Sequence, residues 1–276
     1  MTADINSNLY YCNQNTGIWE QIARNRKKLQ DIIYDFDNFL KEKEYSYNLS
    51  TRNKRQDFIA EVISSLQVNN LEFDKNPYLL AFTNGVVELR TGIFRKAKPE
   101  EYILSTTGWD YEYLDEYADY PLAKELFTNL FNNEKIRCYF INTITMALEN
   151  INRNQEIIFL IGTTAGNGKS TICKLLNYTF GKLGTRFPTS LITSSRENSN
   201  SANSALIDLK SKLFAYCSEP EKNKKININV VKELTGDEIS GRQLFKGQEQ
   251  FEVNATIFVC DNSLLPLDDV DEGITR

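Results

Sequence analysis

Residues 156–176, EIIFLIGTTAGNGKSTICKLL, decide the fold because the hydrophobic pattern changes twice within this stretch. A continuous apolar run, Ile157–Ile161, is typical of a strand that is buried on both faces of a parallel sheet. A loop of small residues follows, and from Thr171 onward apolar residues recur at helical spacing. A strand, a glycine-rich loop and a helix in this order predict the phosphate-binding unit of an α/β protein.

The loop between this strand and this helix has the residue types that phosphate binding requires. Glycines let the backbone approach phosphate oxygens, the loop N–H groups point inward, and the positive end of the helix faces the nucleotide. Lys169 is expected to reach the β- and γ-phosphates, and Ser170 is expected to hold Mg²⁺. The sequence therefore predicts an ATP and Mg²⁺ site, a P-loop, formed by Gly162, Thr163, Thr164, Ala165, Gly166, Asn167, Gly168, Lys169, Ser170 and Thr171.

The entry of this loop departs from the usual pattern, which is G-x-x-x-x-G-K-[ST]. That pattern places a glycine at position 163, where this chain has Thr163, and Gly162 comes one residue earlier. The core sequence GNGKST is intact. We therefore expect a loop that is one residue longer, or wound differently at its entry.

Composition and charge restrict the class of protein. The chain has 276 residues, of which 41% are hydrophobic and 25% charged, which is a globular composition. The net charge of −5 argues against a generally basic surface, so nucleic acid would have to be held by a few focused cations. The sequence has no apolar stretch long enough to span a membrane and no recognisable secretory signal, which predicts an intracellular protein.

The histidine and cysteine content excludes several kinds of site. Histidine is absent, which removes histidine-based triads and nearly every zinc site. The cysteines form no Cys-x-x-Cys pair, and their number is odd. We expect buried, reduced thiols at Cys12, Cys138, Cys173, Cys217 and Cys260.

Residues 1–120 are predicted to form a smaller, mixed α+β domain. Apolar residues recur at helical spacing over about 19–45 and 51–66. A β-meander is expected over about 79–97, because short β-rich runs are separated there by turn signals such as Asn84-Gly85.

Residues 121–276 are predicted to form an α/β domain with a parallel sheet. A helical pattern over about 122–150 precedes the first strand, and helices then alternate with strands. The strands expected to be buried on both faces are Ile157–Ile161, Leu213–Cys217 and Thr256–Cys260.

The order of motifs after the loop resembles that of the superfamily 3 helicases, in the branch with poxvirus-type primase-helicases and phage or plasmid primases. The second strand is followed by SEPE at 218–221, and then by LTGDEISGR at 234–242 and LFKG at 244–247. The third strand is followed by Asn262, and DEGITR at 271–276 looks like the start of the family's arginine motif. The resemblance covers about 75–276 well and 1–74 loosely. It implies an AAA+-like, P-loop ATPase core.

Three candidate catalytic residues follow strands of the predicted sheet. Glu219 follows a buried strand, where a carboxylate can face the γ-phosphate and its Mg²⁺ and polarise the attacking water. Glu221 is expected to have a lesser role, and a solvated acid in a turn is the alternative. At the end of the third strand, the amide of Asn262 can orient the water or sense the γ-phosphate, unless it is a simple turn residue.

The resemblance adds a further catalytic residue, Arg276. In the family, an arginine near this position reaches the nucleotide of the neighbouring subunit and stabilises charge in the transition state. The family's motif continues beyond Arg276, so the resemblance implies an ATPase core that is truncated at its C-terminus, without its final strand and lid.

Lys232, Arg242 and Lys246 are candidate DNA-binding residues between the second and third strands. The sequence FKGQEQ at 245–250 predicts a hairpin tip that carries Lys246. In the family, such a hairpin projects into the central channel of a ring and grips one DNA strand. One cation per subunit, repeated around a ring, gives a phosphate track even in an acidic protein. The alternative for Lys246 is a solvated hairpin lysine.

The resemblance thus implies an ATP-dependent replicative DNA helicase. It would form a ring, of hexameric type, and would move along single-stranded DNA, with a primase domain or protein as a further partner. Two alternatives remain open. A small-molecule kinase would need an Arg-rich lid and a substrate pocket, neither of which the sequence shows. A non-catalytic ring or DNA-binding scaffold would bind ATP without turnover.

Overall fold

The structure is a computed structural model that describes residues 1–4, 8–22, 26–113, 120–151, 154–162, 166–193, 202–218, 224–236, 239–242 and 248–267. The chain forms two compact units. The first comprises 1–75, 84–86 and 95–104, and the second comprises 76–83, 87–94 and 105–276. The predicted domain limits, 1–120 and 121–276, stay a prediction.

The first unit packs two helices against a small antiparallel sheet. The sheet has the order β1 (Thr2–Ala3), β2 (Leu9–Cys12) and β3 (Trp19–Gln21), and the helices are α1 (Arg26–Glu42) and α2 (Arg52–Leu66). Side chains of α1 and α2, among them Leu29 and Ile63, pack on the buried Leu9 and Ile22. This unit therefore has two layers, one sheet and one layer of helices, with the core between them.

Trp19 explains why the first helix begins later than the sequence pattern predicted. Its backbone pairs with Cys12 as part of β3, and its N–H donates to the carbonyl of Ile103 at 2.7 Å. Its indole stacks on Tyr102, with ring centroids 5.4 Å apart, and its Nε1 donates to the carbonyl of Pro99 at 2.8 Å. With these partners, Trp19 contributes more to stability as a residue of β3 than it would in the first turn of a helix. Helix α2, in contrast, has the predicted bounds, and Thr51 caps it by accepting from the N–H of Lys54.

The predicted β-meander over 79–97 is confirmed as a three-stranded sheet. Its order is β4 (Leu79–Phe82), β5 (Gly85–Glu88) and β6 (Ile93–Arg95). A short 3₁₀ helix, Pro99–Glu101, follows it in the chain.

The second unit contains the predicted parallel sheet, which confirms the α/β fold class. The strands are β7 (Ile157–Ile161), β8 (Gly184–Arg186), β9 (Phe214–Ser218) and β12 (Thr256–Asp261), and their spatial order is β7-β12-β9-β8. Every neighbouring pair is parallel. The last strand in the chain, β12, therefore lies between β7 and β9.

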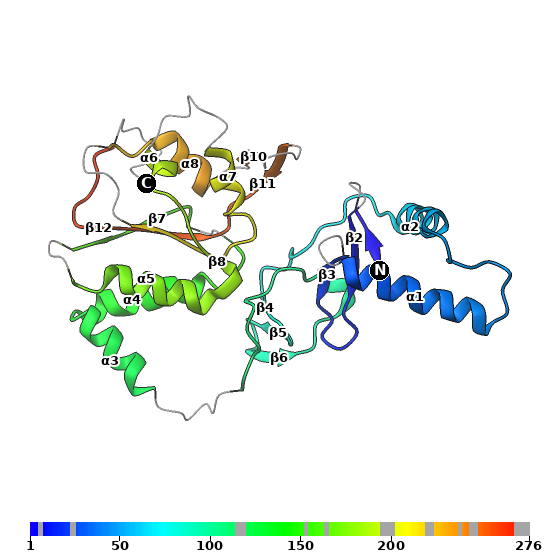
Figure 1. The fold of residues 1–276 in the computed structure, drawn as a ribbon. Coiled ribbons are helices and arrows are strands. Elements are labelled where there is room, and N and C mark those ends of the chain that lie inside the picture. Colours follow the sequence, from blue (N-terminus) through cyan, green and yellow to red (C-terminus); the bar gives the residue numbers. More distant parts are fainter. Residues whose placement is uncertain are drawn as a thin grey trace. The chain divides into compact units, whose positions relative to one another are not determined.

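Helices cover both faces of this sheet, as the continuous apolar strands require. Phe214, Phe258 and Cys260 face a core formed with α3 (Pro121–Leu130), α4 (Glu134–Met146) and α5 (Lys169–Phe180). The intervening Ala215, Cys217, Ile257 and Val259 face a second core with α6 (Ser190–Thr193), α7 (Ala202–Ile207) and α8 (Ile228–Thr235). Figure 1 shows these two groups of helices on opposite sides of the sheet. Burial of a phenylalanine such as Phe214 or Phe258 contributes about 1.5–3 kcal/mol.

The helical pattern predicted over 122–150 is two helices. Helix α3 ends at Leu130, and the side chain of Asn133 starts α4 by accepting from the N–H groups of Lys135 and Ile136 at 2.9 and 3.3 Å. An Asn at this N-cap position satisfies donors that a new helix leaves open, so it favours a break here.

The hairpin predicted after the second strand is confirmed in the part of the chain that the structure describes. Strands β10 (Ile239–Arg242) and β11 (Gln248–Phe251) pair antiparallel, with Arg242 opposite Gln248. Residues 243–247, including Lys246, lie outside the described residues. Across the described ranges, no helix has the length and apolarity that crossing a bilayer requires.

Candidate functional site

The four parallel strands of the second unit all end at one edge of the sheet. Gly162 follows β7, Asn262 follows β12, Ser218 ends β9 and Arg186 ends β8. In open α/β sheets, ligands bind in the crevice outside the carboxyl ends of the strands. The chemistry of this unit is therefore expected at this edge.

Glycines give the loop before α5 its close contacts. Gly166 and Gly168 have φ values of +79° and +80°, which residues other than glycine rarely adopt. A Cβ at Gly168 would overlap Cδ2 of Leu130, the last residue of α3. A Cβ at Gly162 would overlap Nδ2 of Asn167 and would lie 3.0 Å from Nζ of Lys169. These positions therefore allow the loop to fold back on the strand end.

Lys169 is held at the centre of this site by three neutral oxygens. Its Nζ donates to Oδ1 of Asn167 at 2.7 Å, to the carbonyl of Gly162 at 3.1 Å and to Oδ1 of Asn262 at 3.2 Å. An ammonium group has three donors, and each can reach one of these oxygens, with no carboxylate of the described residues bonded to it. The positive charge at the sheet edge is thus available to an anion.

One cavity brings together seven of the residues predicted for nucleotide chemistry. It is lined by Gly166, Asn167, Gly168, Lys169, Ser170, Thr171 and Asn262, and also by Cys260 and Asp261. The first helical turn of α5 supplies backbone N–H groups at its positive end, a position that favours phosphate. The cavity therefore has a helix N-terminus, a lysine, two hydroxyls, two amides, a thiol and one carboxylate, that of Asp261, around one space.

Sequence reasoning missed Cys260 and Asp261. Asp261 ends β12, its carbonyl accepts from the N–H of Gly162 at 3.3 Å, and its Oδ1 accepts from the N–H of Asn262 at 2.7 Å. Asp261 thereby ties the loop entry to the end of β12 and fixes the backbone of Asn262. The signal that could have found Asp261 is the polar pair Asp261-Asn262 at a strand end. The sequence prediction used only Asn262 of this pair.

The structure leaves most of the other predicted site residues unplaced. Thr163, Thr164, Ala165, Glu219, Glu221, Lys246 and Arg276 lie outside the described residues, as does the side chain of Arg242. Lys232 is on α8 and does not line the cavity. The catalytic, metal-binding and DNA-binding roles of these residues stay predictions.

The cysteines correct one expectation. Cys173, Cys217 and Cys260 are buried and free, but Cys12 is half-buried and Cys138 is exposed. Cys138 lies two residues from the buried Phe140 on α4, which places it on the opposite side of that helix. The Sγ atoms of Cys173 and Cys260 are 3.1 Å apart, and their hydrogen bond together with burial raises the pKa of Cys173.

Two families match the chain. Residues 2–132 match the family described as D5 N terminal like, and residues 160–276 match a family of unknown function, DUF5906.

Curated relatives are viral proteins. A protein of Acanthamoeba polyphaga mimivirus named "Putative helicase" is 28% identical over 94% of this chain and 31% of its own length. The vaccinia virus uncoating factor is 29% identical over 85% of this chain and 31% of its own length. An African swine fever virus protein named "Putative primase" is 26% identical over 74% of this chain and 22% of its own length. The chain thus spans less than a third of the length of these relatives.

Among solved structures, the apo NrS-1 C terminal region matches with a TM-score of 0.49 and 18% identity, over 79% of this chain and 50% of that one. The D5 N terminal-like match and the viral proteins named as putative helicases and primases confirm the resemblance to primase-helicases that the sequence predicted.

Proposed function

We propose that this chain is the ATP-dependent part of a ring-forming DNA helicase. In this proposal it binds ATP with Mg²⁺ at the loop before α5, and hydrolysis moves single-stranded DNA through a ring of subunits, of hexameric type. The observation that carries it is the position of Lys169, whose Nζ lies between the ends of β7 and β12 and, among the described residues, donates to neutral oxygens alone.

The residues around this cavity fit a nucleoside triphosphate. Glycines at 162 and 168 leave no room for a Cβ, as expected where backbone N–H groups must cradle an anion. Lys169 would exchange its amide and carbonyl partners for β- and γ-phosphate oxygens, and Ser170 would hold the Mg²⁺ that supplies charge neutralisation. Asn262, freed from Lys169, could then orient a water molecule without adding negative charge.

The remaining roles rest on the family. Glu219 would share the Mg²⁺ and polarise the attacking water, with Glu221 in a lesser role, and Arg276 would act on the nucleotide of a neighbouring subunit. The hairpin of β10 and β11 would present Lys246 to the DNA backbone, supported by Lys232 and Arg242. A primase domain or protein is a further partner under this proposal.

The test compares two lysines of the same helix. Lys169→Ala should lower ATP affinity about 10- to 150-fold, because one charge-assisted hydrogen bond to phosphate contributes about 1.5–3 kcal/mol. ATP turnover should fall to background. Lys174→Ala is the matched control, since Lys174 is exposed on α5 and does not line the cavity.

The outcomes separate this function from its alternatives. Unchanged ATP affinity and turnover in Lys169→Ala would refute the nucleotide site. ATP binding without turnover, with DNA bound, would favour a ring or DNA-binding scaffold. Transfer of phosphate to a nucleoside would favour a small-molecule kinase.

A further inference from the structure

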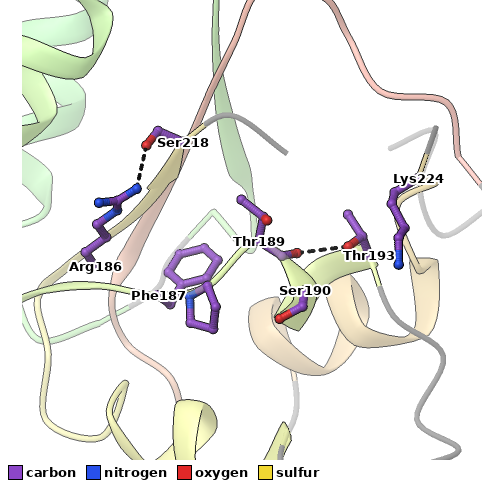
Figure 2. Close-up of a pocket in the computed structure, with 8 residues that line it drawn as sticks. Arg186, Phe187, Thr189, Ser190, Thr193, Ser218 and Lys224 are labelled. Carbon is purple, nitrogen blue, oxygen red and sulfur yellow. Dashed lines mark hydrogen bonds between the residues drawn. The ribbon is translucent and has the colours of Figure 1, made fainter. Parts of the chain in front are cut away.

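A second cavity lies at the carboxyl ends of β8 and β9. Its polar lining comes from Arg186, Thr189, Ser190, Thr193, Ser218 and Lys224, and none of its described lining residues belongs to the cavity at α5. Figure 2 shows Arg186 and Ser218 on one side, Lys224 on the other, and the hydroxyl-bearing residues between them. Within the described part of the chain, no carboxylate lines this cavity.

Strand pairing fixes Arg186 at the rim of this cavity. Arg186 is the last residue of β8 and pairs with Tyr216 of β9, and the N–H of the next residue, the buried Phe187, donates to the carbonyl of Tyr216 at 3.0 Å. The guanidinium is exposed, and its Nη2 donates to Oγ of Ser218 at 3.2 Å. A guanidinium has five donors, so most of them remain available to a ligand.

The hydroxyl of Ser218 is polarised by this contact. Because Ser218 Oγ accepts from Arg186, its own proton is free to be donated to an anion. The hydroxyls of Thr189 and Ser190 add two further donors on the same lining. The cavity thus offers donors that converge from two strands and from the segment at α6.

Lys224 is held on the other side by the segment that leads into α8. The N–H of Asn227 donates to the carbonyl of Ile192 in α6 at 2.8 Å, and the N–H of Ile226 donates to the carbonyl of Pro266 at 2.9 Å. Ile226 is 1% exposed, so this segment is anchored two residues after Lys224. A second cation is therefore placed beside α6 by the fold.

A phosphate group suits these donors better than a carboxylate or a base. Two cations and several hydroxyls match an anion with several equivalent oxygens. The aromatic ring in the lining, Phe187, is 3% exposed and so offers no face for a base to stack on. Contact would be with a phosphate alone, independent of nucleotide sequence.

We propose that this cavity binds a backbone phosphate of single-stranded DNA. Arg186 stands apart from the nucleotide held at α5, because β12 and β9 lie between β7 and β8, a span of about 14 Å at about 4.8 Å per strand. The cations and hydroxyls of the cavity are the reason for expecting a phosphate. The assignment of that phosphate to DNA rests on the proposed function. The contact adds a focused cation site to an acidic chain.

The experiment measures how salt weakens binding of a dye-labelled oligothymidine, by fluorescence anisotropy. For single strands, each lost phosphate contact lowers the slope of log affinity against log salt by about 0.7. Between about 50 and 200 mM salt, Arg186→Gln or Lys224→Gln should therefore lose about 2.6-fold less affinity than the wild type. Lys135→Gln, at an exposed lysine of α4, should keep the wild-type slope, and Arg186→Lys should largely keep it.

Two further arms identify the source of the phosphate. Affinity for a fluorescent ATP analogue should be unchanged in Arg186→Gln. Reduced ATP affinity with an unchanged DNA slope would assign the cavity to a nucleotide and overturn the proposal, and no change in either would overturn phosphate binding altogether.

Failure of the two proposals can be told apart. A wild-type chain that does not bind the oligonucleotide at low salt refutes the DNA site, while the Lys169→Ala comparison still decides the ATP site. If Arg186→Gln lowers the thermal melting temperature, the slope of Arg186→Lys decides, because it keeps the charge. A slope for Arg186→Lys as low as that of a folded Lys224→Gln would contradict a charge-based contact.

Discussion

Gly166 and Gly168 form a matched pair for testing the loop before α5. Both have φ near +80°, so an alanine at either position should lower the free energy of unfolding by about 1–2 kcal/mol, because its backbone must be left-handed. A Cβ at 166 would meet no atom of the described residues within 4 Å, whereas a Cβ at 168 would overlap Cδ2 of Leu130. Relief of that overlap requires the Leu130 side chain to move, and a turn of about 30° off its rotamer would cost about 0.5–1.5 kcal/mol. Gly168→Ala should therefore be the more destabilising, by about 1 kcal/mol.

A double-mutant cycle isolates this overlap. Leu130→Ala alone loses packing, but it should remove the extra cost of Gly168→Ala, which gives a coupling free energy of about 1 kcal/mol. The same leucine change should not couple to Gly166→Ala.

Urea denaturation measures the free energy of unfolding for this cycle. Trp109 is a suitable probe, because it lies in the second unit, packs on Tyr178 at 5.0 Å between ring centroids, and donates to that residue's carbonyl. A Trp19→Phe background leaves Trp109 as the single tryptophan, since the chain has two. Equal destabilisation by the two alanines, or no coupling with Leu130, would refute the contact between α3 and the loop.

Two further predictions concern ionisable groups. Burial raises the pKa of Glu101, but hydrogen bonds from Arg95 and from the N–H of Lys98 outweigh it, so the pKa lies below its usual 4.5. Wild type should therefore lose stability relative to Glu101→Gln as pH falls below about 4.5, checked by urea denaturation across that range, and a constant difference would argue against the pairing. For the thiols, Cys138 should react first with a disulfide reagent and Cys12 more slowly, while Cys217, whose pKa burial raises to about 12, should react only on unfolding. A fast phase that survives Cys138→Ser would contradict this order.

The strands that the sequence located correctly share one property. Ile157–Ile161 is found as predicted, and the other two buried strands differ from the prediction by a single residue at their ends. Each is a continuous apolar run, which is stable only as a strand of a sheet covered on both faces. Strand β8 was missed because Gly184, Thr185 and Arg186 have no apolar signature, and its pairing depends on β9 rather than on its own residues. The cavity beside Arg186 was missed with it.

The candidate site was predicted in parts but not in its assembly. The loop residues came from a local motif, and Asn262 came from its place after a strand. Their contact through Lys169 joins residues 93 positions apart, and it depends on β12 lying next to β7. No local pattern encodes which strands are neighbours, so this contact could only be seen in the folded chain.

The position of β12 has a consequence for how this sheet assembles. Pairing Ile257 with Ile157 closes a loop of 100 residues, at an entropic cost of about 4 kcal/mol beyond a constant, against about 3 kcal/mol for the 30 residues between Gly184 and Phe214. During synthesis, β8 and β9 can meet early, but β7 must wait for β12, which follows all three of the other strands in the chain. Folding should be slow for a unit of this size, because the pairing of β7 with β12 joins residues so far apart in the chain.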